Sequence, residues 1–133
     1  MATILVMDDD PMVRTVIARI LTVRGYRVLE AGSADEGLRL CAALGDTLDM
    51  LIAEPALQSL SEQPLADRVL RRCPAAKILY ISAWPPEIVG WRQGLLQPSA
   101  FLQKPFSAPK LLIAVETVLH SPTEGTRTRT AGS

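Results

Sequence analysis

The chain has 133 residues, of which 48% are hydrophobic and 21% charged, a composition typical of one globular domain with its own core. Fourteen Lys and Arg balance fourteen Asp and Glu, so the net charge of zero gives no field that attracts nucleic acid or anionic lipid. The apolar runs are far shorter than the roughly 20 residues that cross a bilayer, and the N-terminus lacks the basic segment of a secretory signal. We therefore expect a cytoplasmic domain that contacts neither nucleic acid nor a membrane.

The first half of the chain alternates short β-branched runs with stretches of helical period, as βα units do. A strand is predicted over Thr3–Met7, followed by a helix that starts near Pro11 and is stopped by Gly25. A second strand is predicted over 26–31. The segment SADE at 33–36 then has the pattern of a capping box and predicts the start of a second helix.

The second half continues the alternation with shorter and less regular units. Strands are predicted over Met50–Ala53, Lys77–Ser82 and 100–103, with a helix around Leu65–Arg72 and a short one near 87–93. Together with the first half, these units predict an α/β fold built on a doubly wound, five-stranded parallel sheet.

The last predicted helix begins after the capping residue Ser107 and ends near His120. The remaining segment, SPTEGTRTRTAGS, contains one Ala and no larger apolar residue, so it has nothing to bury. We expect one domain over 1–120 and a disordered tail or linker over 121–133.

Polar residues follow four of the five predicted strands, and the carboxyl ends of parallel strands meet at one edge of a doubly wound sheet. These residues are Asp8, Asp9 and Asp10 after the first strand, Glu54 after the third, Ser82 at the end of the fourth and Lys104 after the fifth. Clustered carboxylates raise one another's pKa unless a divalent cation such as Mg²⁺ or an ammonium group neutralises them. Lys104 supplies such an ammonium.

The segment LVMDDDP, the carboxylate after the third strand, the pair Ser82-Ala83 and the run Lys104-Pro105-Phe106 together resemble the receiver domain of two-component response regulators. The resemblance covers about residues 3–120. It implies a flavodoxin-like, three-layer αβα fold with strand order 2-1-3-4-5. It also implies signalling with a histidine kinase or an output domain as partner, rather than an enzyme in its own right.

The resemblance also implies roles for single residues. It assigns Asp8, Asp9 and Glu54 to Mg²⁺, Ser82 and Lys104 to the phosphate, Glu54 to the phosphoacceptor position and Phe101 to the aromatic switch. A cis Lys104-Pro105 bond is a further family feature, although only about 5–6% of X-Pro bonds are cis in general.

Glu54 departs from the family pattern, which has an aspartate at the phosphoacceptor position. Its extra methylene moves the carboxylate by roughly 1.5 Å, and a misplacement of ~1 Å costs ~10²-fold in an oriented reaction. The next segment also departs, because Pro55 has no backbone N–H to offer a phosphoryl oxygen. We therefore expect a degenerate receiver with impaired phosphotransfer and with Mg²⁺ bound weakly or not at all.

Other interpretations of the same residues remain open. Asp10 precedes Pro11 and is expected to cap the first helix. In a purely structural interpretation, Ser82 supplies hydrogen bonds at a strand end and Lys104 neutralises Asp8 and Asp9. The aromatic residues Trp84, Trp91, Phe101 and Phe106 form either a partner surface or a patch of core.

Two alternative functions follow from the acidic run. Asp8 and Asp10 after an apolar strand also resemble the pair of haloacid dehalogenase phosphohydrolases, with Asp8 as nucleophile and Asp10 as acid/base. Those enzymes need a further acidic pair after the lysine, and beyond Lys104 the chain has only Glu116 and Glu124. The other alternative is a conventional receiver that is phosphorylated on Glu54.

Overall fold

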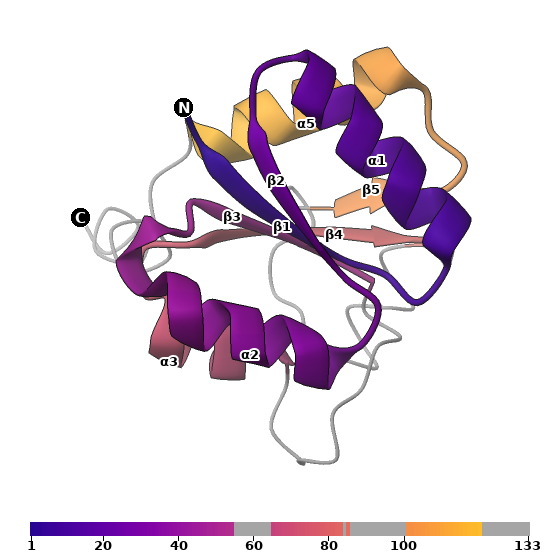
Figure 1. Cartoon of the computed structure of the whole chain (residues 1–133). Coiled ribbons are helices and arrows are strands. Elements are labelled where there is room, and N and C mark those ends of the chain that lie inside the picture. The colour runs from indigo at the N-terminus through magenta and orange to yellow at the C-terminus, as the bar shows by residue number, and fades with distance from the viewer. Residues whose placement is uncertain (55–64, 84, 86–100, 121–133) are drawn as a thin grey trace, which may run out of the picture.

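A five-stranded parallel sheet forms the centre of the molecule (Figure 1). The computed structural model describes residues 1–54, 65–83, 85 and 101–120. The strands run in the order β2-β1-β3-β4-β5, which confirms the expected strand order. They are β1 (Thr3–Met7), β2 (Arg27–Ala31), β3 (Met50–Ala53), β4 (Lys77–Ser82) and β5 (Phe101–Gln103).

Helices cover both faces of the sheet and make three layers (Figure 1). Helices α1 (Pro11–Val23) and α5 (Ala108–Leu119) pack together on one face, and α2 (Ala34–Leu44) packs with α3 (Leu65–Arg72) on the other. A short 3₁₀ helix, η1 (Gly45–Thr47), follows α2. This arrangement is the doubly wound α/β fold predicted from the alternation of strands and helices.

The interior strand β1 contributes side chains to both cores of the molecule, one on each face of the sheet. Ile4 and Val6 belong to the core beneath α1 and α5, whereas Leu5 and Met7 belong to the core beneath α2 and α3. Successive side chains of a strand point to opposite faces, so a strand covered on both faces is apolar throughout. The uninterrupted apolar run within Thr3–Met7 in the sequence is therefore the expected signature of an interior strand of the sheet.

Side-chain caps define where the helices begin. The Asp10 carboxylate accepts hydrogen bonds from the backbone N–H groups of Met12 (2.9 Å) and Val13 (3.4 Å), and so it caps α1 as expected. The Ser33 hydroxyl likewise accepts from Glu36 N–H at the start of α2, and the Ser107 hydroxyl caps α5.

Gly37 lets α2 approach the sheet closely. A Cβ atom at this position would lie 2.1 Å from Met7 Cε and 2.6 Å from its Sδ, far inside van der Waals contact. Met7 has no exposed surface and lies at the site end of β1. The absence of a side chain at Gly37 therefore sets the spacing between α2 and the strand that carries the acidic run.

The structure differs from the sequence-based prediction at the start of β2. The strand begins at Arg27 rather than at residue 26, because the Tyr26 N–H donates to Leu21 O and closes the end of α1 instead of joining the sheet. Gly25 precedes this turn with a φ of 104°, a conformation that glycine adopts readily.

Some predicted features lie outside the described residues. They are the helix at 87–93, the first residue of the predicted strand 100–103, Pro55 and the loop after it, Trp84 and Trp91, and the segment 121–133. Among the described residues, Phe101 is half-buried, and Phe106 is half-buried against the core of α1 and α5. The same part of the chain contains no helix long and apolar enough to cross a membrane.

Candidate functional site

Residues at the carboxyl ends of four strands meet at one edge of the sheet. Backbone hydrogen bonds extend the strand pairing past the strand ends, from Glu54 N–H to Met7 O (3.1 Å) and from Lys104 N–H to Ser82 O (2.7 Å). In the same way, the Asp8 N–H donates to Ala31 O at 3.2 Å. The extended pairing aligns the strand ends and brings Asp8, Glu54, Ser82 and Lys104 to one place.

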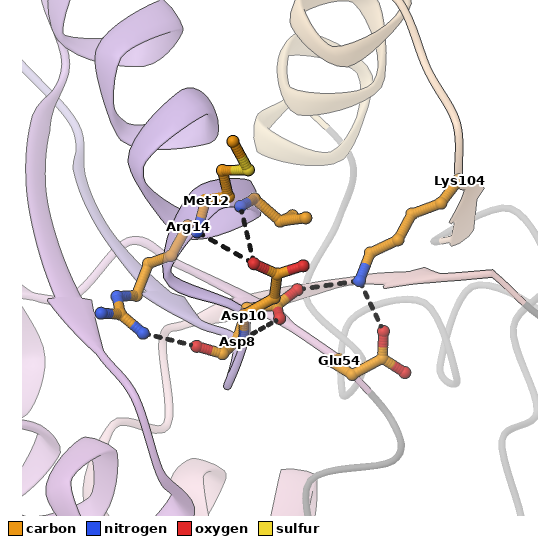
Figure 2. A network of polar contacts seen from close by, with 7 residues as sticks. Asp8, Asp10, Met12, Arg14, Glu54 and Lys104 are labelled. Carbon is orange, nitrogen blue, oxygen red and sulfur yellow. Dashed lines mark hydrogen bonds and ion pairs between the residues drawn. The ribbon is translucent and has the colours of Figure 1, made fainter.

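Lys104 lies between two carboxylates (Figure 2). Its ammonium Nζ is 3.0 Å from Asp8 Oδ2 and 3.0 Å from Glu54 Oε2. The side chains of Asp8 and Glu54 are only 3% and 10% exposed, and that of Lys104 is 20% exposed. The structural interpretation of Lys104 is thus correct for Asp8, but the second partner is Glu54 rather than Asp9.

The two carboxylates also affect the charge state of Lys104. Burial alone lowers the pKa of an ammonium group because it disfavours the charged form. At Lys104 the hydrogen bonds and charges of Asp8 and Glu54 outweigh this desolvation, and the pKa is raised above its usual value. Lys104 therefore remains a cation through the neutral range and stabilises two buried negative charges.

The second oxygen of Asp8 holds the loop that follows β1. Asp8 Oδ1 accepts a hydrogen bond of 2.9 Å from the backbone N–H of Asp10. The carboxylate of Asp10 in turn accepts hydrogen bonds from backbone N–H groups in the first turn of α1. This arrangement supports the capping interpretation of Asp10, whose Oδ1 accepts both hydrogen bonds.

The other predicted site residues have different surroundings. Asp9 is exposed, whereas Asp8 beside it is buried. Ser82 is 1% exposed, and its backbone carbonyl pairs with Lys104. The Lys104-Pro105 peptide bond is cis, as the resemblance implied.

Arg14 is a residue of the site that the sequence analysis did not identify. Its guanidinium Nη1 donates to the backbone carbonyl of Asp8 at 2.8 Å, and its Nε is 3.3 Å from Glu30 Oε1 (Figure 2 shows the first contact). In the sequence, Arg14 lies in the first turn of the helix predicted to start near Pro11, shortly after the acidic run. That position was the only signal in the sequence, and it did not indicate a backbone carbonyl as partner.

The donor set is chemically suited to a hard divalent cation, since Mg²⁺ prefers carboxylate oxygens. Asp8 and Asp9 would hold Mg²⁺, with Glu54 as a further oxygen donor. In the structure, however, the Lys104 ammonium lies between Asp8 and Glu54 and forms an ion pair with each, so it offsets one of their two negative charges. Across the described ranges, no three His, Cys, Asp or Glu side chains are grouped in a way that could hold a metal ion.

The fold and the acidic edge of the sheet define a flavodoxin-like signalling domain. The sequence model of the "Response regulator receiver domain" family matches residues 4–116. The chain therefore belongs to the response regulator receiver domain family, the receiver component of two-component signalling. Domains of this family interact with histidine kinases and output domains, and they typically bind Mg²⁺.

Individual relatives agree with this assignment. The chain is 28% identical over 118 residues to the sensor kinase CckA of Brucella abortus, covering 89% of this chain and 12% of the kinase. It is 30% identical over 122 residues to the transcriptional regulator NtrC of Azospirillum brasilense, covering 92% of this chain and 25% of the regulator. The chain thus spans a quarter or less of these two proteins.

Solved structures show the same fold. A receiver domain protein from Clostridium thermocellum superposes with a TM-score of 0.72 at 25% identity, over 90% of this chain and 94% of that one. The receiver domain of the hybrid histidine kinase CckA superposes with a TM-score of 0.65 at 28% identity, over 90% of this chain and all of the other.

Proposed function

We propose that this chain is an atypical receiver, which signals through protein contacts with little or no dependence on phosphorylation. The observation that carries the proposal is the Glu54 carboxylate, which follows β3, is buried and pairs with Lys104 at 3.0 Å. A partner of this domain would be a histidine kinase or an output domain, in line with the family.

The length of the Glu54 side chain is the first supporting argument. Phosphoryl transfer requires the attacking oxygen to lie in line with the donor, and a misplacement of about 1 Å costs about 10²-fold. Glutamate carries its carboxylate about one C–C bond, roughly 1.5 Å, farther from the backbone than aspartate does. We therefore expect Glu54 to be a poor phosphoryl acceptor.

The charge of the Glu54 carboxylate also supports the proposal. Glu54 already engages the ammonium of Lys104, and this contact gives Lys104 a partner without any phosphate. A carboxylate carries one negative charge, whereas a phosphoryl group carries about 1.5 to 2 at neutral pH. Glu54 thus reproduces part of the interaction that a phosphorylated site would make.

The ion pairs of Lys104 with Asp8 and Glu54 also affect the expected binding of Mg²⁺. Mg²⁺ at this edge of the sheet would compete with the Lys104 ammonium for the oxygens of Asp8 and Glu54. Asp8 and Asp9 are the residues that would hold it, and its chemistry there would be to offset the charge of a phosphoryl group. Because Lys104 already satisfies Asp8 and Glu54, we expect weak Mg²⁺ binding.

Intact-mass spectrometry after incubation with acetyl phosphate and Mg²⁺ tests the proposal. We expect no phosphoryl adduct on the wild type, because the Glu54 carboxylate is misplaced. In Glu54→Asp we expect a rate at least about 100-fold higher, since the shorter side chain restores the reach of the family's acceptor.

Glu36→Asp is the matched control, because it makes the same chemical change at an exposed carboxylate in the first turn of α2. It should remain unmodified. Stoichiometric phosphorylation of the wild type, mapped to Glu54 by peptide sequencing, would show that the chain is a conventional receiver and would refute the proposal.

A further inference from the structure

Arg14 contacts the ends of two strands at the edge of the acidic site. Its Nη1 donates to Asp8 O at 2.8 Å at the end of β1, and its Nε pairs with Glu30 Oε1 at 3.3 Å in β2. A Cβ added at Gly32 would lie 3.0 Å from the same Nη1, so the guanidinium also lies close to the backbone after β2. These contacts leave the guanidinium little freedom.

Asp8 is held at its backbone carbonyl and at its carboxylate, in addition to the backbone N–H that donates to Ala31 O. Arg14 binds the backbone carbonyl, while the side-chain carboxylate accepts from Asp10 N–H (2.9 Å) and from Lys104 Nζ (3.0 Å). In Figure 2 Arg14 and Lys104 lie on opposite sides of Asp8. A planar peptide leaves only two soft dihedral angles per residue, and the direction of the Asp8 carbonyl sets one of them.

We infer that Arg14 is the positioning residue of the site, which orients the Asp8 carbonyl and thereby keeps the Asp8 carboxylate aimed at Lys104. The inference depends on the contacts around Asp8 and not on whether Glu54 accepts a phosphoryl group. Its failure is thus separate from a failure of the proposed function. A charge-assisted hydrogen bond from a planar guanidinium suits this role, since its strength and direction both constrain the acceptor.

A purely structural role is the competing explanation. In that case Arg14 joins β2 to α1 through Glu30, and its loss loosens the fold without a specific effect on Asp8. The two explanations differ at the Asp10 N–H, which donates to the Asp8 carboxylate and so reports its orientation. The Lys110 N–H is a matched reference, because it also donates to a side-chain oxygen at a helix start, that of Ser107 at 3.3 Å.

Amide hydrogen exchange of the full chain, measured by NMR, separates the explanations. In Arg14→Met we expect the exchange of the Asp10 N–H to accelerate about tenfold or more, the effect of losing one charged hydrogen bond. The Lys110 N–H should keep its wild-type rate. Glu30→Gln removes the salt bridge and leaves the Arg14 contact to Asp8 O, so it should change neither rate appreciably.

Two further variants decide the outcome if Arg14→Met does not fold. Arg14→Lys retains one cationic donor and should recover part of the Asp10 protection. Gly32→Ala keeps Arg14 but displaces its guanidinium, and it should accelerate the Asp10 N–H and not the Lys110 N–H. Equal acceleration at both amides in these variants, or an unchanged Asp10 rate in all of them, would overturn the inference.

Discussion

At the scale of single residues, the central feature is an ammonium shared by two buried carboxylates. Removing one partner of a buried ion pair leaves an uncompensated charge and typically costs about 3–5 kcal/mol. The chain keeps all three charges, and Lys104 gains a raised pKa from them. Lys104 thus has a structural role that does not require phosphate.

This role predicts a pH dependence for Lys104. A folded-state pKa above the usual value of 10.5 means that its stabilisation is complete below pH 10.5 and is lost as the pH rises through the folded pKa. Lys104→Met should lower the free energy of unfolding at pH 7 by about 3 kcal/mol. We also expect the wild-type free energy of unfolding, measured in urea, to fall as the pH rises through the Lys104 pKa, and Lys104→Met should remove part of that decline.

Lys110→Met is the control, because Lys110 is an exposed lysine in α5 and its loss should change stability little. If Lys104→Met and Lys110→Met gave the same stability and the same pH profile, the structural role of the shared ammonium would be refuted.

The candidate site was only partly predictable at this scale. Residue types after each strand were sufficient to single out Asp8, Glu54 and Lys104. The sequence did not distinguish the buried Asp8 from the exposed Asp9, because adjacent residues of a loop take directions that its backbone angles decide. It also gave no indication that Arg14 would bind a backbone carbonyl, which every residue carries.

At the scale of elements, the close contact between α2 and β1 limits which residue can occupy position 37. Helix α2 begins at a Ser33 cap and has acidic residues in its first turn, both of which the sequence shows directly. How closely the helix approaches the sheet was not predictable, because that distance depends on the pairing of Gly37 with Met7 across the core.

Gly37→Ala tests this contact. Alanine favours a helix over glycine by about 1 kcal/mol, but overpacking of a core costs about 1–3 kcal/mol. The added Cβ would meet three atoms of the buried Met7, so we expect the overpacking cost to exceed the gain and a net loss of about 1 kcal/mol in urea unfolding.

A second substitution supplies the control. In the Met7→Ala background the Cβ has space, and Gly37→Ala should then be neutral or stabilising. Additive effects of the two substitutions would contradict the contact as described.

At the scale of the whole molecule, both cysteines belong to the core. Cys41 and Cys73 have no exposed surface, and the Cys73 thiol donates to Cys41 O at 3.4 Å, joining α2 to the residue after α3. Burial, with a smaller contribution from Cys73, raises the pKa of Cys41 to about 12. Little of the Cys41 thiol is therefore ionised to the nucleophilic thiolate, and its side chain is buried.

We accordingly expect the thiols to react only when the fold opens. With a chromogenic disulfide reagent at pH 8, native protein should be modified at least about a thousandfold more slowly than protein in denaturant, given unfolding free energies of at least about 5 kcal/mol for such domains. Destabilising variants such as Gly37→Ala should react faster in proportion. Rapid labelling of native wild type would show that one cysteine is accessible without unfolding.

The sequence by itself determined most of the described helices and strands of this protein. The period of the apolar residues distinguishes strands from helices, and Gly, Pro and capping residues mark where they end. It also located the acidic edge of the sheet, because each polar residue of that edge directly follows a strand. Only the tertiary structure decided which groups touch. Lys104 lies 96 residues from Asp8 and 50 from Glu54 along the chain, and the strand order and the backbone angles of each loop bring the three charges within hydrogen-bonding distance.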